Sequence, residues 1–393
     1  MSWKQIFSLA RRLQFVKLAL KAQQSMSQLC QAFGISRRNG YKWKARFERE
    51  GRRGLRDRSS RPGQSPRRTS ALWLSRLGRL RRQHRSWGSR KLAVRLCKEY
   101  GSHGAPAPRT IGKWLKRMKL SRGGRRGSPR GPRLSRRELT VARRSNQVWT
   151  VDFKGWFRTG DGRRVEPLTV RDAFSRYVLA VRLLNHQGWL GVRRVFLGLF
   201  GQHGYPNLIR VDNGGPFGSK GPAGLSRLSA WWTALGIGVE FIEPGHPEQN
   251  GAHEQMHRVL KAETTRPGSP NRRAQQRRIN RWVKTYNQIR PHEGLGQRTP
   301  AQVYRGRRAP ARRLVLEYPK GWSTRRVRSN GQIKWLGRKR FVGEAFIGYP
   351  IGLKPLSQGK RAVYFAGLLI GELWDGDAGG IRPAKYGKGS GSS

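Results

Sequence analysis

The chain has 393 residues, which favours two to three domains. Its 83 Lys and Arg residues outnumber its 21 Asp and Glu residues, and the formal net charge of +62 indicates a polyanionic partner, most commonly nucleic acid. Aromatic residues form 10% of the chain, which excludes a simple disordered basic tail.

Two cysteines, Cys30 and Cys97, exclude a disulfide scaffold and a zinc finger built on paired cysteines. Charged residues interrupt every apolar run that approaches the length of a membrane span, so we expect a cytoplasmic protein with no membrane partner.

Residues 1–50 show helical periodicity and the pattern of a helix-turn-helix DNA-binding domain. A short helix in SMSQLCQAF is followed by a turn at Gly34, and Ser36 is placed to cap a second helix. An ordinary three-helix domain with a solvated basic face would show the same pattern, but the charge of this chain favours a helix that reads DNA. The expected DNA-binding residues of this helix are Arg37, Arg38, Asn39, Tyr41 and Lys42.

Residues 51–69 are rich in Arg, Gly, Ser and Pro, which predicts a basic linker. Three helical pieces follow in residues 70–120, and the apolar residues of the last piece recur at spacings of three and four. We interpret this segment as a second helix-turn-helix domain, in which Arg109, Lys113 and Lys116 contact DNA. Residues 121–146 form a second basic linker.

The composition changes at Gln147, where strand-like sequence begins. We expect strands at 148–158, 164–171 and 175–184, with a Gly-Asp-Gly hairpin turn between the first two. Helices and short strands then alternate, which predicts an α/β domain over 147–310 with a mixed five-stranded sheet. Residues 320–380 alternate strand-like runs with Gly turns, which suits a small all-β barrel, and residues 381–393 form a disordered tail. The protein is therefore predicted to be multidomain, with two all-α domains, one α/β domain and one all-β domain.

Three acidic residues of the α/β domain are candidate metal ligands. Asp152 lies within the first strand, Asp212 ends an apolar strand, and Glu254 lies near the start of a helix. Any one of them alone is better explained as a turn former or an ion-pair partner. Converged carboxylates repel each other unless cations lie between them, so the three together indicate Mg²⁺ or Mn²⁺.

The segments around these acids resemble the three motifs of insertion-sequence transposases, whose catalytic core is similar to that of retroviral integrase. The matching segments are VWTVDFKGWF, VDNGGPF and EPGHPEQNGAHEQMHRVLKAE, followed by YNQIRPHEGLGQRTPAQVY, and the N-terminal helix-turn-helix and the SWGSRKL block extend the likeness over most of the chain.

The resemblance implies a ribonuclease H-like core in which Asp152, Asp212 and Glu254 are the catalytic residues and bind two Mg²⁺ or Mn²⁺ ions. Asp152 would bridge the ions, and the other two would hold one each. The implied partner is double-stranded DNA, both the element ends and the target, bound by a homodimer or higher homo-oligomer without a small-molecule cofactor. The implied location is the prokaryotic cytoplasm, in association with the nucleoid.

Two glutamates compete for the third position. Glu248 is separated from Asp212 by 35 residues, close to the usual spacing of the family, whereas 41 residues separate Asp212 from Glu254. Glu254 is nevertheless placed where the family's glutamate opens a helix, and Glu248 lies in the Gly- and Pro-rich approach. We therefore expect Glu254 to be the ligand.

Residues 253–257 also match HExxH, the zinc-protease signature. A protease of this kind needs a third zinc ligand, and the sequence downstream offers only Glu263, on the same helix. We therefore reject the protease, and we expect Asp172 to be structural and Asp161 to be a turn residue. The sequence also leaves open a sequence-specific DNA-binding protein with an inactive core, and a nuclease that never joins strands.

Overall fold

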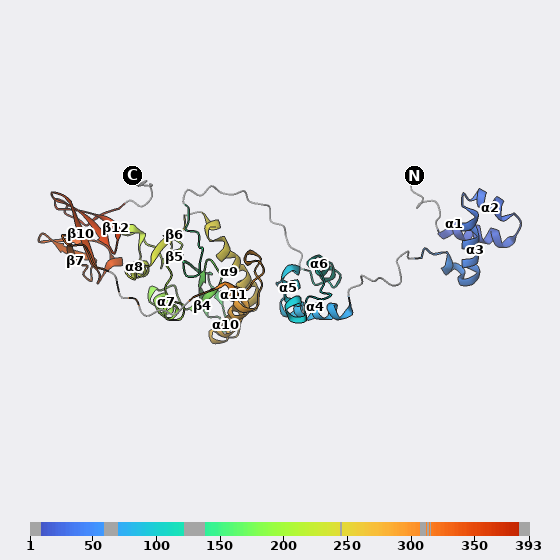
Figure 1. Ribbon diagram of the computed structural model, residues 1–393, viewed down its shortest axis with the longest axis horizontal. Helices are drawn as coiled ribbons and strands as arrows, with labels where there is room; N and C mark the ends of the chain where they lie inside the picture. Colours follow the sequence, from blue (N-terminus) through green and yellow to red (C-terminus); the bar gives the residue numbers. More distant parts are fainter. Residues whose placement is uncertain are drawn as a thin grey trace. The chain divides into compact units, whose positions relative to one another are not determined.

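The computed structural model describes residues 9–58, 70–121, 138–243, 246–306, 312, 314 and 316–384, without the side chains of Pro247 and Glu248. It separates into two compact units, residues 1–69 and 70–393 (Figure 1). Most of each predicted basic linker, residues 59–69 and 122–137, lies outside the described residues. Within the described part of the chain, no helix combines the length and apolarity needed to cross a membrane.

The first unit contains the predicted helix-turn-helix. Its helices are α1 (Leu9–Lys21), α2 (Met26–Ala32) and α3 (Arg37–Glu50). Ser36 caps α3, and Gly34 takes a positive φ of 68° in the turn. α2 and α3 lie close together at Gly40, where an added Cβ would lie 2.4 Å from Cys30 Sγ. The tight crossing of the two helices therefore requires glycine at this position.

The second unit begins with the three helices predicted for residues 70–120. They are α4 (Ala71–Gln83), α5 (Ser89–Tyr100) and α6 (Pro108–Arg117), packed around Trp73, Leu77, Leu80 and Trp87. The α4–α5 turn contacts the α/β domain, because Ser86 donates a hydrogen bond to Glu263 and Arg90 pairs with Glu293.

A mixed sheet forms the centre of the α/β domain. Its strands are β1 (Val148–Phe153), β2 (Phe157–Arg158), β3 (Arg164–Asp172), β4 (Val178–Leu184), β5 (Leu208–Val211) and β6 (Gly238–Phe241). β3 lies antiparallel between β1 and β4, while β1, β5 and β6 run parallel. The predicted mixed sheet is thus confirmed, with the short β2 as an additional strand. The strand predicted over 148–158 is broken at Gly155, whose φ is +81°.

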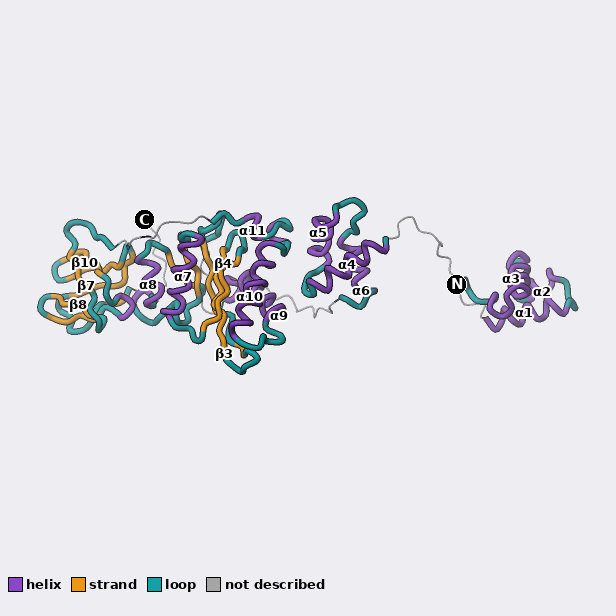
Figure 2. Tube along the Cα trace, turned by 90° about the horizontal axis from the view of Figure 1, so that it is seen from below, coloured by secondary structure: helices purple, strands orange, loops and turns teal. Residues whose placement is uncertain are grey.

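Helices cover both faces of this sheet (Figure 2). One face packs on α7 (Trp189–His203) and α8 (Arg227–Ala234), and its core includes Trp149 and Val151 of β1. The other face packs on α9 (Gly251–Thr264) and α10 (Arg272–Gln288), followed by the short α11 (Pro300–Val303). Successive strand residues point to opposite faces, so Thr150 and Asp152 face α9.

The predicted C-terminal barrel is wrong. The strands are β7 (Ser323–Arg326), β8 (Gln332–Trp335), β9 (Arg338–Phe341), β10 (Pro350–Ser357), β11 (Lys360–Phe365), β12 (Leu368–Trp374) and β13 (Arg382–Pro383). Five of them form an open antiparallel sheet in the order β13-β12-β11-β10-β7, and β8 and β9 form a separate hairpin. Among the described residues, no pairing joins the edge strands β7 and β13. Closure is disfavoured because β13 is two residues long and contains Pro383, which cannot donate a ladder hydrogen bond. β13 also lies within the segment predicted to be a disordered tail.

Candidate active site

Asp152 and Asp212 lie side by side at the carboxyl ends of two parallel strands. β1 and β5 pair with Thr150 opposite Arg210, so continuing this register by two residues brings Asp152 opposite Asp212. Adjacent strands are ~4.8 Å apart, and residues in the same register point to the same face. Both carboxylates therefore emerge on the face covered by α9.

The local environment opposes the ionisation of these two carboxyl groups. Burial, together with the charges of Asp212 and Glu254, raises the pKa of Asp152 to about 7, against the opposing effects of the Phe153 amide and Lys154. Burial also raises the pKa of Asp212, partly offset by a hydrogen bond from the Gly214 amide. Asp212 Oδ1 is buried and has no hydrogen-bond partner. A divalent cation would satisfy this oxygen and remove the repulsion, so the residues present fit a metal site.

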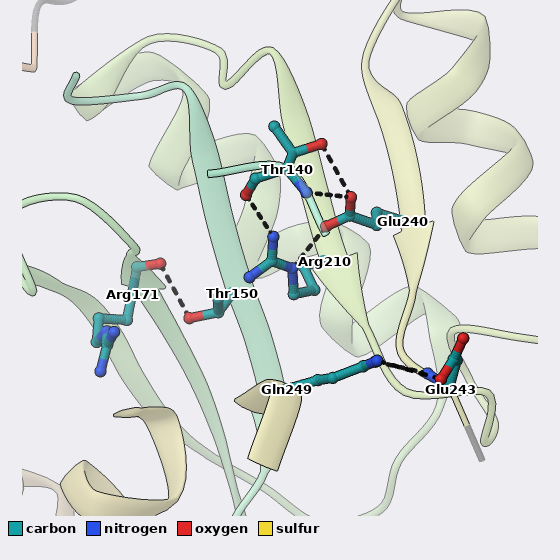
Figure 3. Close-up of polar contacts among 7 residues, drawn as sticks. All are labelled: Thr140, Thr150, Arg171, Arg210, Glu240, Glu243 and Gln249. Atoms are coloured by element: carbon teal, nitrogen blue, oxygen red, sulfur yellow. Dashed lines mark hydrogen bonds and ion pairs between the residues drawn. The ribbon is translucent and has the colours of Figure 1, made fainter. Parts of the chain in front are cut away.

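An ion pair holds β5, the strand that precedes Asp212 (Figure 3). Arg210 donates to Glu240 of β6 at 2.6 Å and to the carbonyl of Thr140 at 2.7 Å. The amide and hydroxyl of Thr140 both donate to Glu240 at 2.9 Å. Arg210 and Glu240 are nearly buried, so this bond network fixes the end of β5 beside β6.

Glu254 lies in the first turn of α9 and is exposed. The approach to this helix is fixed by Gln249, which accepts a hydrogen bond from the Glu243 amide at 2.8 Å (Figure 3). The negative charge of Glu254 also raises the pKa of Asp152, in keeping with a carboxylate on the same side of the domain. The side chain of the competing Glu248 lies outside the described residues, so the preference for Glu254 stays a prediction.

The two histidines of the HExxH segment point into the protein. His253 and His257 are buried and hydrogen-bond to threonine hydroxyls of the sheet, with His253 between Thr150 and Thr169. His257 contacts Thr169 and lies beside Asp152. The potential ligand atoms of Asp152, His253 and His257 all lie within 4.8 Å of one another, and the described part of the chain contains no other such group of three or more His, Cys, Asp or Glu residues.

Thr150 and Thr169 contact the site histidines but are not among the residues predicted from the sequence. The sequence offered an indirect signal for Thr150. The histidines are four residues apart and share one face of a helix, and Thr150, two residues before Asp152, shares the face of the strand with it. Thr169 could not be found in this way, because its position beside Asp152 depends on the pairing of β3 with β1.

Asp172 is structural, as expected. It is buried at the end of β3 and accepts hydrogen bonds from the amides of Asn146 and Ser175 at 2.8 Å. These bonds fix the turn after β3. Asp161 is likewise a turn residue that accepts from Thr159 and the Arg163 amide.

The predicted DNA-binding side chains are available on two helices. Arg37, Arg38, Asn39, Tyr41 and Lys42 are exposed in the first half of α3, and Arg109, Lys113 and Lys116 are exposed on α6. The opposite faces of these helices are fixed in cores, α3 by Trp43 and α6 by Ile111 and Leu115. Both sets are therefore presented to solvent by rigid helices.

Two solved structures are similar to parts of the chain. The HTLV-2 integrase catalytic core domain in complex with magnesium is 19% identical, with a TM-score of 0.34 over 42% of this chain and 100% of that chain. A chain of the simian T-cell lymphotropic virus intasome in complex with PP2A regulatory subunit B56 gamma is 16% identical, with a TM-score of 0.37 over 79% of this chain and 100% of that chain.

Two insertion-element proteins are similar in sequence. An uncharacterized 39.2 kDa protein of insertion element IS476 from Xanthomonas euvesicatoria is 31% identical over 229 residues, 58% of this chain and 63% of that protein. An uncharacterized 31.7 kDa protein of insertion element IS407 from Burkholderia multivorans is 29% identical over 188 residues, 48% of this chain and 65% of that protein. This chain thus covers somewhat less than two thirds of each relative's length.

Family models match successive parts of the chain. A helix-turn-helix domain matches residues 11–63, and a homeodomain-like domain matches residues 39–115. Two integrase core domain models match residues 142–247 and 235–300. The chain therefore combines regions that match helix-turn-helix models with regions that match integrase core models. Residues 322–373 match the C-terminal domain of the IS481 family transposase.

Proposed function

We propose that this chain is a DNA transposase that binds the ends of a mobile element, cuts them in a metal-dependent reaction and joins them to target DNA. The observation that carries the proposal is the position of Asp152 and Asp212, each two residues beyond the paired Thr150 and Arg210 of the parallel strands β1 and β5, with an unsatisfied buried oxygen on Asp212. Such a pair, in a ribonuclease H-like core and with Glu254 near it, suits divalent cations. Helix-turn-helix domains supply the affinity for DNA.

The roles proposed for the carboxylates are those that the resemblance to insertion-sequence transposases implies. Asp152 would bind both ions, and Asp212 and Glu254 would bind one each. When bound, the two ions would activate the attacking oxygen and stabilise the leaving oxygen of the phosphodiester. Lys154, whose positive charge acts on Asp152, would add a favourable electrostatic interaction with the DNA phosphate to that of the ions.

Two successive phosphodiester reactions account for cutting and joining. Water first attacks the phosphodiester at the element end, and the bond to the departing 3′-oxygen breaks to free a 3′-hydroxyl. That hydroxyl then attacks a phosphodiester of the target, which releases a target 3′-hydroxyl as the new bond forms. Both steps need the same carboxylates, because the same kind of bond is broken at one site.

The α3 helix and the α6 helix would bind element ends. The exposed residues Arg37, Arg38 and Asn39 begin α3, where helix-turn-helix proteins contact base edges. We propose that a homodimer or higher homo-oligomer carries out the reaction, because two element ends must be joined to one target.

A strand-transfer assay tests the function. The substrate is a linear duplex that carries the sequences flanking the gene, incubated with full-length protein and Mg²⁺. We expect cleavage and joining by the wild type, and loss of both in Asp152→Asn and Asp212→Asn, with end binding kept or improved because repulsion from phosphate falls. Full activity in either variant would disprove the catalytic assignment. End binding without cleavage by the wild type would favour a DNA-binding protein with an inactive core.

A further inference from the structure

The hydroxyl of Thr169 has three hydrogen-bonding partners. It lies 2.8 Å from the backbone carbonyl of Asp152, and 2.7 Å from Nε2 of both His253 and His257. A threonine hydroxyl has one hydrogen to donate and two lone pairs. Because a carbonyl only accepts, the hydroxyl donates to Asp152, and both histidines must donate from Nε2 to Thr169.

This proton count determines the tautomers of the two histidines. With its hydrogen on Nε2, His253 has a free lone pair on Nδ1, which accepts from the Thr150 hydroxyl at 2.7 Å. The other acceptor near that hydroxyl, the carbonyl of Arg171, is 3.4 Å away and competes weakly. Both ring nitrogens of His253 are therefore satisfied within the protein.

In a neutral His257 ring, the hydrogen on Nε2 leaves a lone pair on Nδ1. This nitrogen lies 3.7 Å from Oδ2 of Asp152, too far for a hydrogen bond. When Asp152 is ionised, a nitrogen lone pair and a carboxylate oxygen therefore lie close together with no proton between them.

We propose that His257 is an additional metal ligand of the active site, whose Nδ1 binds the same cation as Asp152 Oδ2. The inference rests on the proposed function, because it needs a metal held by Asp152. It adds a nitrogen to a site whose other expected ligands, from Asp212 and Glu254, are oxygens.

The added nitrogen sets which metals the site prefers. Mg²⁺ is best bound by oxygen ligands, whereas Co²⁺ and Zn²⁺ bind imidazole well. His257 should therefore raise the affinity for Co²⁺ and Zn²⁺ and contribute little to Mg²⁺ binding.

Metal titration of the full chain tests this inference without measuring activity. Calorimetry would give the dissociation constants of Co²⁺ and Mg²⁺, and the visible spectrum of bound Co²⁺ would report its ligands. His257→Gln retains an amide donor for Thr169 and removes the Nδ1 position. His253→Gln is the matched control, because it makes the same change to the same partner on the same helix.

We expect His257→Gln to weaken Co²⁺ about tenfold or more and to alter its spectrum. Mg²⁺ binding should change by no more than about threefold, and His253→Gln should leave both metals within that range. Equal losses for both metals, equal effects of the two variants, or no effect of His257→Gln would overturn the proposal and make His257 a packing residue.

Two further measurements complete the test. Asp152→Asn should abolish binding of both metals. Binding that persists in this variant would show that Asp152 is not a metal ligand and would contradict the proposed function.

A melting curve shows whether each variant is folded. If His257→Gln is not folded, wild-type protein labelled with ¹⁵N in histidine is titrated with Zn²⁺ instead. One Nδ1 resonance should then shift, and the absence of any shift would overturn the proposal.

Discussion

Replacing Asp152 with Asn should stabilise the protein while removing its activity. Burial and neighbouring negative charge raise the pKa of this carboxyl from 3.8 to about 7. The folded state therefore binds the proton more tightly than the unfolded state, and ionisation costs stability as the pH rises from 3.8 to 7. A shift of ~3 pKa units corresponds to about 4 kcal/mol.

The variant carries no such charge, so its advantage should grow with pH. In metal-free buffer we expect Asp152→Asn to exceed the wild type in free energy of unfolding by ~1–2 kcal/mol at pH 5 and by up to about 4 kcal/mol at pH 8. Urea unfolding followed by tryptophan fluorescence in the presence of EDTA measures this difference. Adding Mg²⁺ should stabilise the wild type and leave the variant unchanged.

Asp161→Asn is the control, because a hydrogen bond from Thr159 lowers the pKa of Asp161 and its ionised form is favoured. That variant should gain no stability at pH 8. An Asp152→Asn protein that is no more stable than the wild type at pH 8 would show that ionising Asp152 costs the folded state no free energy. That result would remove the electrostatic argument for a metal.

Three further predictions concern the glutamates and the first helical domain. Glu254→Gln should abolish cleavage with Mg²⁺, and Glu248→Gln should leave most of it. The reverse result in the same cleavage assay would show that the ligand is Glu248, as its spacing from Asp212 suggests. Arg38→Ala should weaken binding to end DNA by about 1–3 kcal/mol and binding to random duplex little, and equal losses on both DNAs in a binding titration would make α3 only a basic face. Gly40→Ala should lower the stability of the first unit by ~1–3 kcal/mol because its Cβ would meet Cys30 Sγ, which lies 2.4 Å away; an unchanged first melting transition of the full chain would contradict the close helix crossing.

Local sequence was sufficient for features that depend on nearest neighbours along the chain. Ser36 and Gly34 predicted the start of α3 and the turn before it, and the structure confirms both. The hairpin before β3 followed from glycine in the turn, where Gly162 has a φ of +78°. Cap and turn geometries are determined by a few consecutive residues, so they can be read without knowing the fold.

Tertiary structure alone decided the features that join distant segments. Barrel closure depends on whether the edge strands β7 and β13 meet, and alternation of apolar residues is the same in an open sheet and a closed one. The lone pair of His257 depends on Thr169, which is 88 residues away and contacts it only because β3 pairs with β1 beneath α9. Hydrogen-bond partners across strands follow from register and helix packing, and neither is encoded in a short stretch of residues.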